Sequence, residues 1–236
     1  MLWWIIAALA AFFVKGLCGF ANTLVFTTIL SFGQNNLAIS PVELLLGYPT
    51  NAILAWKERR AIDWKLCLPL CAMVLAGCLP GAFLLKNVDA RAIKIFFGVV
   101  IVLIALEMLL RKGSTGKQNR WVMLMIGILS GMLCGLFGVG ALLGAYLSRV
   151  TDDTHAFKGN MCIVFFVENT FRLILYIASG IITLGTLQQA LWLGPVMLVS
   201  LWLGMKAGHV LNEKTAKKIV LVMLIISGIA LIINSL

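Results

Sequence analysis

The amino-acid sequence predicts an all-α polytopic membrane protein made of two inverted repeats, each a glycine-broken re-entrant helical hairpin followed by three transmembrane helices. The chain of 236 residues is 61% hydrophobic and 12% charged, with a mean hydropathy of +1.03. A soluble domain has about 45–50% apolar and about 25% charged residues, so this composition indicates an integral membrane protein. Two further observations support the fold class: glycines interrupt the two longest apolar runs, and positive charge is spread unevenly among the loops.

The first repeat is expected to cover residues 1–112. Its first apolar run, 2–33, would be roughly 48 Å long as one straight helix, whereas the hydrocarbon core is only about 30 Å thick. The segment GLCGFAN interrupts this run, so we expect a hairpin that turns there. Transmembrane helices are expected at about 42–56, 64–85 and 92–110, with Glu43 in the first turn after Pro41. Residues 113–119 are expected to form a cytoplasmic linker.

The second repeat is expected to cover residues 120–236 and to have the same order of features. Its hairpin, 120–148, contains the interruption CGLFGVG, and helices are expected at about 159–180, 186–211 and 218–235. Both interruptions contain Cys-Gly, and the second helix after each hairpin contains a GxxxG pair, Gly77 and Gly81 or Gly204 and Gly208. These pairs predict close helix packing, and the repeated order predicts an internal duplication.

The loop charges discriminate between two topologies. If every apolar run crossed the membrane once, each side would carry eight loop lysines and arginines. If both glycine-broken runs return to the side from which they enter, thirteen lie on one side and three (Lys86, Arg91 and Lys94) on the other. Positive charge accumulates in cytoplasmic loops. We therefore expect the second arrangement, in the cell (inner) membrane, with both termini outside and the two halves inverted, since each has three spans.

The two interruptions are the predicted substrate site. Non-helical backbone at membrane depth is tolerated only inside protein or beside a water-filled cavity, so the two turns should face each other. The second arm of each hairpin begins just after its glycines, and a helix N-terminus can hold an anion through its free N–H groups and positive dipole end. The candidate substrate-binding residues are Lys15, Cys18, Gly19, Phe20, Asn22, Thr23, Cys134, Gly135, Gly138, Gly140, Glu168 and Arg172.

Several of these residues have a structural alternative. Lys15 could offer charge to the anion, cap the first arm or extend to the cytoplasmic face. Glu168 and Arg172, four residues apart, could pair on one helix face or act at the site, because ionisable groups at membrane depth are functional candidates. Cys18 and Cys134 could be small turn residues, contact a sulfur anion, or form a redox pair. Thr50 and Asn51 are expected to make hydrogen bonds between helices.

The glycine pattern resembles that of the TauE/SafE sulfite-exporter family, also called the TSUP family. In GILSGMLCGLFGVGALLGAYL, four glycines (Gly131, Gly135, Gly138 and Gly140) fit the family's GxxxGxxGxG pattern, and FVKGLCGF provides a shorter match in the first half. The repeat layout and chain length agree over nearly the whole chain. The resemblance implies a transporter of small sulfur-containing anions such as sulfite or thiosulfate, or of sulfonated organic acids.

The expected function is a secondary membrane transporter of a small anion. An anion channel and a non-transporting membrane subunit remain alternatives, because broken helices also suit a channel filter. An enzyme is not expected, since the sequence contains neither HExxH nor GxSxG, and neither a cofactor nor a metal is expected. The expected partners are the small anion and the lipid bilayer, with a coupling ion and a homo-oligomer left open. The net charge of +10 lies in short loops, so no nucleic-acid partner is expected.

Overall fold

The computed structural model describes residues 2–31, 36–87, 120–137, 140–151 and 153–210, with a few isolated positions outside these ranges. These residues form helices joined by short loops, without a β-strand, which confirms the all-helical prediction for this part of the chain. The predicted helices at 92–110 and 218–235 lie almost entirely outside the described residues. The elements are α1 (Leu2–Cys18), α2 (Asn22–Ser31), α3 (Asn36–Lys57), the 3-10 helix η1 (Arg59–Ala61), α4 (Trp64–Asn87), α6 (Arg120–Phe137), α7 (Ala141–Val150), α8 (Thr154–Ala178) and α9 (Leu184–Val210).

The first apolar run is broken at residues 19–21, between α1 and α2. Gly19 has φ +87° and Ala21 has φ 71°, a left-handed conformation that ends a helix and that glycine adopts without steric cost. After this turn α2 packs back against α1. The Phe26 ring lies edge-on against those of Trp4 and Phe12, with centroids 5.8 and 6.4 Å away.

The second apolar run is broken between Phe137, the last residue of α6, and Ala141, the first residue of α7. Gly140 stands immediately before α7 and lies against the Phe165 ring on α8. A Cβ at Gly140 would collide with three carbons of that ring. Only glycine therefore allows α7 to begin this close to α8.

Two helix pairs, α4 with α6 and α1 with α9, pack through glycine. A Cβ at Gly77 or Gly81 of α4 would meet the backbone of α6, at Ile128 and Met132. Likewise, a Cβ at Gly204 of α9 would meet the backbone of α1, at Phe13 and Gly16. The prediction that the GxxxG pairs mark close helix packing is therefore confirmed.

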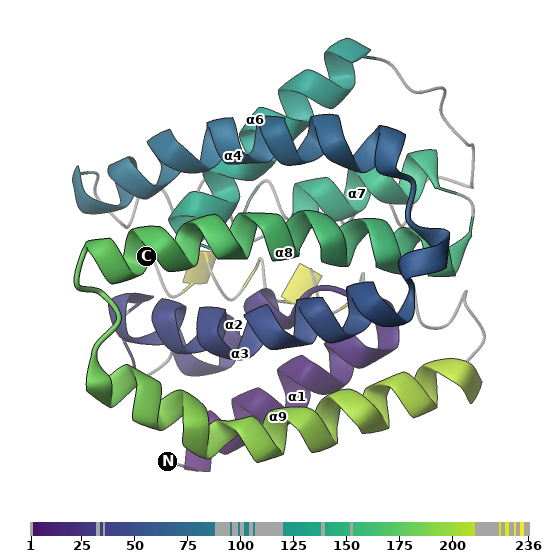
Figure 1. Ribbon diagram of the computed structural model, residues 1–236. Helices are drawn as coiled ribbons and strands as arrows, with labels where there is room; N and C mark the ends of the chain where they lie inside the picture. Colours follow the sequence, from purple (N-terminus) through teal and green to yellow (C-terminus); the bar gives the residue numbers. More distant parts are fainter. Residues whose placement is uncertain are drawn as a thin grey trace.

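The helices α3 and α8 run side by side between these two pairs (Figure 1). The rings of Tyr48 and Phe166 stack across them with centroids 4.9 Å apart. At one end, the hydroxyl groups of Ser40 and Tyr176 lie 3.0 Å apart. The bundle is thus layered, and its centre is the interface of α3 with α8.

The helix α3 begins at Asn36, six residues before the predicted start at 42. Pro41 lies inside the helix rather than at its start, at the cost of one backbone hydrogen bond that proline cannot donate. The expectation that Glu43 lies in the first turn is therefore wrong. Glu43 lies two turns into α3 and its side chain is buried.

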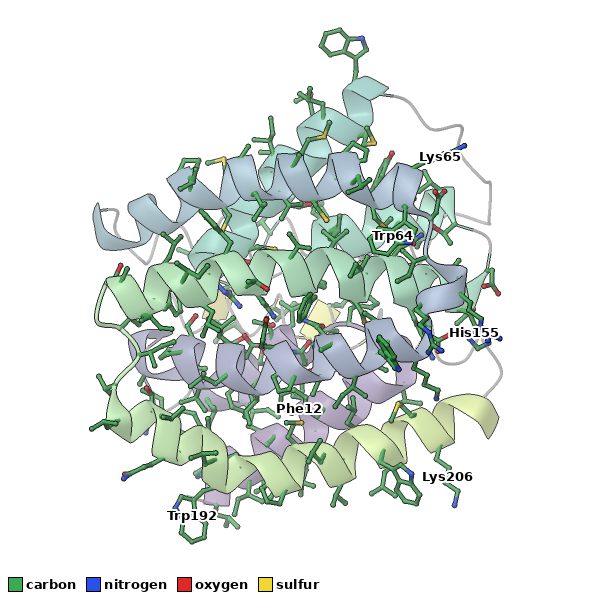
Figure 2. The ribbon with its side chains drawn as sticks, viewed as in Figure 1. Phe12, Trp64, Lys65, His155, Trp192 and Lys206 are labelled. Carbon is green, nitrogen blue, oxygen red and sulfur yellow. The ribbon has the colours of Figure 1, made fainter. Side chains whose placement is uncertain are left out.

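The outer surface of the bundle is apolar, with tryptophans projecting from it. Trp192 extends from α9 away from the other helices (Figure 2) and is 75% exposed, and Trp202 on the same helix is 55% exposed. Three described helical segments are long and apolar enough to cross a membrane: Trp64–Gly81, Thr154–Ala178 and Leu184–Gly208. A surface of this kind is stable in a lipid bilayer rather than in water.

Candidate anion-binding site

Polar side chains are buried at the centre of this apolar bundle. Seven of the buried polar side chains on α2, α3 and α8 form a group that we call the polar core: Asn22, Thr23, Glu43, Asn51, Glu168, Asn169 and Arg172. Burying a charged or amide side chain in apolar surroundings is costly unless it is paired. Such a group at membrane depth therefore indicates a functional site.

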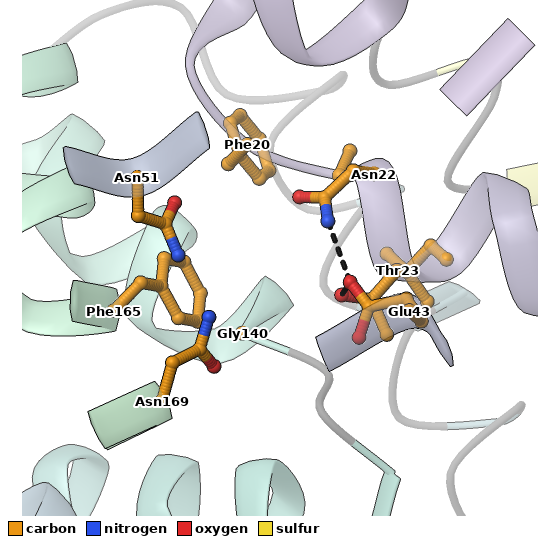
Figure 3. Close-up of a pocket in the computed structure, with 10 residues that line it drawn as sticks. Phe20, Asn22, Thr23, Glu43, Asn51, Gly140, Phe165 and Asn169 are labelled. Atoms are coloured by element: carbon orange, nitrogen blue, oxygen red, sulfur yellow. Dashed lines mark hydrogen bonds between the residues drawn. The ribbon is translucent and has the colours of Figure 1, made fainter. Parts of the chain in front are cut away.

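A small cavity opens within the polar core, with room for about one or two water-sized groups. Residues Phe20–Leu24, from the first break and the start of α2, form one wall, and Gly140 of the second break contributes to another. The amide side chains of Asn51 and Asn169 lie across the cavity from Asn22 and Glu43 (Figure 3). Residues of both breaks therefore line one cavity in the described part of the chain.

The carboxylate of Glu43 lies at the N-terminus of α2. Asn22 Nδ2 donates a hydrogen bond to Glu43 Oε1 (2.6 Å), and Thr23 Oγ1 donates a second one to the same oxygen (2.7 Å). The first N–H groups of a helix have no intrahelical partner, and the dipole is positive at this end. The start of α2 therefore already holds an anionic group, which belongs to the protein itself.

The guanidinium of Arg172 lies between two carboxylates. It donates hydrogen bonds to the Cys134 carbonyl (3.1 Å) and to Asn169 Oδ1 (3.2 Å). It approaches Glu43 Oε2 and Glu168 Oε1, each at 3.6 Å, which is too long for a good hydrogen bond. The Nε of Arg172 and the Oε2 atoms of both glutamates have no hydrogen-bond partner. The i,i+4 pair expected from sequence is present, within a cluster of three charges.

Lys15 is buried at the end of α1, next to the polar core but not among the residues that line the cavity. Its Nζ donates to the Gly47 carbonyl of α3 at 3.4 Å. Two of the three expectations for Lys15 are therefore wrong, because the side chain neither caps its own helix nor extends to the surface.

A model of the sulfite exporter TauE/SafE family matches residues 4–231, which is nearly the whole chain. The chain belongs to this family. The TauE/SafE family consists of membrane transporters and not of enzymes, so the predicted family, transporter class and non-enzymatic function are confirmed. No curated protein and no solved structure matches the chain significantly.

In this TauE/SafE protein, four of the twelve predicted site residues line the cavity: Phe20, Asn22, Thr23 and Gly140. Arg172 and Glu168 adjoin it through the charge cluster. Gly19 forms the first turn, and a Cβ there would come within 2.8 Å of Lys158. Gly135 is buried inside α6, and Gly138 lies outside the described residues.

The two cysteines of the interruptions do not line the cavity. Cys18 Sγ donates to the Val14 carbonyl of its own helix at 2.8 Å. Cys134 is fully buried and contributes its backbone carbonyl, which Arg172 binds. The six cysteines, all within the described residues, form no disulfide, so the expectation of a redox pair has no support in this geometry.

Sequence reasoning missed Glu43, Asn51, Phe165 and Asn169 as residues of the cavity. Their spacing carried a signal, since residues four apart lie on one helix face. On α3 this face presents Glu43, Gly47 and Asn51, and on α8 it presents Phe165 and Asn169. For Asn51, the expected helix–helix hydrogen bond is absent at Oδ1, which has no partner.

Proposed function

We propose that this protein is a secondary transporter that carries a small sulfur-containing anion, such as sulfite, thiosulfate or a sulfonate, and binds it at the cavity between the two helix breaks, which widens to admit it. The observation that supports the proposal most directly is that three groups able to bind an anion lie close together in one buried place. These are the hydrogen-bond donors at the start of α2, the Arg172 guanidinium and the side-chain amide of Asn51, which lines the cavity. Oxyanions bind to such donors and to arginine.

The proposed architecture is two inverted repeats with re-entrant hairpins. In the two repeats, α1 corresponds to α6, α3 to α8 and α4 to α9. If each helix is replaced by its counterpart, the contact of α1 with α9 becomes the contact of α6 with α4. The contact of α3 with α9 likewise becomes that of α8 with α4, and all four contacts are present. This exchange is what a pseudo-two-fold relation between the halves would produce, and it supports the predicted duplication.

The ends of the bundle support the predicted topology. Glu58 Oε2 lies 2.8 Å from His155 Nδ1, and the Asp63 N–H donates to Asn160 Oδ1 at 2.8 Å. Lys65 and His155 lie at the same end of the molecule (Figure 2). The loops at 57–65 and 149–158 would be on opposite sides if every run crossed once. Their contact favours the arrangement in which the hairpins return and both basic loops are cytoplasmic.

The topology is tested by single cysteines introduced into a cysteine-free variant. Positions in 57–65, 111–120 and 149–158 should react with an impermeant thiol reagent from the cytoplasmic side only, and both termini from the outside. Reaction of 111–120 and 149–158 from opposite sides would contradict the re-entrant arrangement.

The substrate assignment is tested by binding to the purified protein. Sulfite, thiosulfate and methanesulfonate should each be compared with acetate, an anion of similar size that contains no sulfur. We expect saturable binding of at least one sulfur anion, tighter than that of acetate. If acetate binds equally well, the proposal of an anion transporter stands, but the proposed preference for sulfur-containing anions is wrong.

A further inference from the structure

The carboxylate of Glu43 occupies the position at which an incoming anion would find its best donors. Both side-chain donors at the start of α2, from Asn22 and Thr23, are directed to Glu43 Oε1. Glu43 is 2% exposed and lines the cavity, and its second oxygen, Oε2, has no hydrogen-bond partner. A bound anion and an ionised Glu43 would compete for the same donors.

The buried charges that the structure describes around the cavity balance each other when no anion is bound. Among the described residues, the buried charged side chains are Lys15, Glu43, Glu168 and Arg172, two of each sign. In the described part of the chain, the other titratable groups near Glu43 are Tyr176 on α8 and Cys134 on α6, and Cys78 on α4 lies near Glu168. An added anion would therefore leave one negative charge uncompensated in an apolar interior, which is strongly unfavourable.

We infer that Glu43 takes up one proton when the anion binds, so that anion and proton occupy the site together. This inference rests on the proposed function. The proton comes from the aqueous phase and adds to a carboxylate oxygen of Glu43. Asn22 and Thr23 are then free to donate to the anion, and the new carboxyl O–H becomes a further donor. If the anion carries a single negative charge, the proton compensates it and the net charge of the site does not change.

Glu43 is a better acceptor for this proton than Glu168. Glu168 is not among the residues that line the cavity, and its Oε1 faces Arg172 Nε (3.6 Å) and Cys78 Sγ (3.8 Å) rather than the donors of α2. Neutralising Glu43 releases the donors that an anion needs. Neutralising Glu168 would release none of them.

The test counts protons taken up on binding. Thiosulfate and methanesulfonate are suitable probes, because their charges do not change where carboxylates and histidines titrate, roughly pH 4–8. Calorimetric titration at neutral pH in buffers of different ionisation enthalpy gives the number of protons bound with each anion. For methanesulfonate we expect about one proton, and an affinity that rises about tenfold for each unit by which the pH falls.

Three variants locate the proton. Glu43→Gln keeps the shape of the protonated side chain, so uptake should fall to near zero and binding should be tighter at neutral pH. Glu168→Gln should retain the uptake. Glu58→Gln, which alters an ion pair at the end of the bundle, should change neither quantity. If Glu43→Gln does not fold, retained uptake in Glu168→Gln still supports the inference, and its loss there overturns it.

The outcomes separate the two proposals. Binding to the wild-type protein without proton uptake would overturn the role of Glu43 and leave the transporter proposal intact. Unchanged uptake in a folded Glu43→Gln variant would do the same. If sulfite and both probes fail to bind the wild-type protein, the proposed function and this inference fail together.

Discussion

Arg172→Lys keeps one positive charge in the polar core but removes the planar fork of donors. Arg172 donates to the Cys134 carbonyl and to Asn169 Oδ1 while it faces Glu43 and Glu168 at 3.6 Å. A lysine ammonium is a compact charge and cannot reach all four groups. Losing one hydrogen bond of a charged group costs about 1.5–3 kcal/mol. If the guanidinium also contacts the anion, binding should weaken by about 10- to 100-fold.

The assay is calorimetric titration of the purified variant with thiosulfate, accompanied by its melting temperature. Arg59→Lys is the matched control, because Arg59 is exposed and donates to the Trp56 carbonyl at 3.0 Å, far from the cavity. We expect Arg59→Lys to bind like the wild type. An unchanged affinity in a folded Arg172→Lys variant would refute the assignment of Arg172 to the site and leave it a structural residue.

Three further predictions follow from the contacts of single side chains. Thr23→Val removes one donor to Glu43 Oε1 and should weaken thiosulfate binding about tenfold. Thr27→Val should not weaken binding, because the Thr27 hydroxyl bonds the backbone of its own helix. Equal affinities of the two variants would contradict the role of α2. Gly140→Ala should displace the Phe165 ring into the cavity and abolish transport with little loss of melting temperature, and normal transport would place the substrate path elsewhere. Gly204→Val should separate α1 from α9 and lower the melting temperature by several degrees; Gly194→Ala on the same helix meets no described atom within 4 Å and should leave it unchanged or higher.

The helix breaks could be predicted from sequence because glycines mark both of them. Glycine at positive φ ends α1, which is a local effect. Gly140 before α7 is visible in the sequence as a glycine, but its need for the absence of a Cβ comes from the Phe165 ring on α8. The GxxxG pairs were equally readable, because close approach requires the smallest side chain at that spacing. The start of α3 could not be predicted correctly, because Pro41 was expected at the start of a helix and instead lies inside it.

The site was only partly predictable because its chemistry depends on tertiary contacts. Glu43 belongs to the site because α2 packs over α3 and places Asn22 and Thr23 against its carboxylate. No local sequence pattern predicts this packing. The direction of a side chain within a turn is also not readable from composition. Cys18 was a candidate because of its place beside Gly19, yet its thiol points back to the Val14 carbonyl. The polar face with i,i+4 spacing on α3 is the feature of the sequence that points to this site.

The central claim, that a small sulfur-containing anion is transported through the cavity between the two breaks, is tested most directly by exchange in proteoliposomes. Vesicles containing the purified protein and loaded with unlabelled sulfite are diluted into a trace of radiolabelled sulfite, and the same is done with Gly140→Ala. The account predicts saturable, counter-transport-driven accumulation of label in the wild type and none in Gly140→Ala. Flux that does not saturate would indicate a channel. Equal accumulation in the variant, or none in the wild type when sulfite, thiosulfate and methanesulfonate are each tried, would contradict the account.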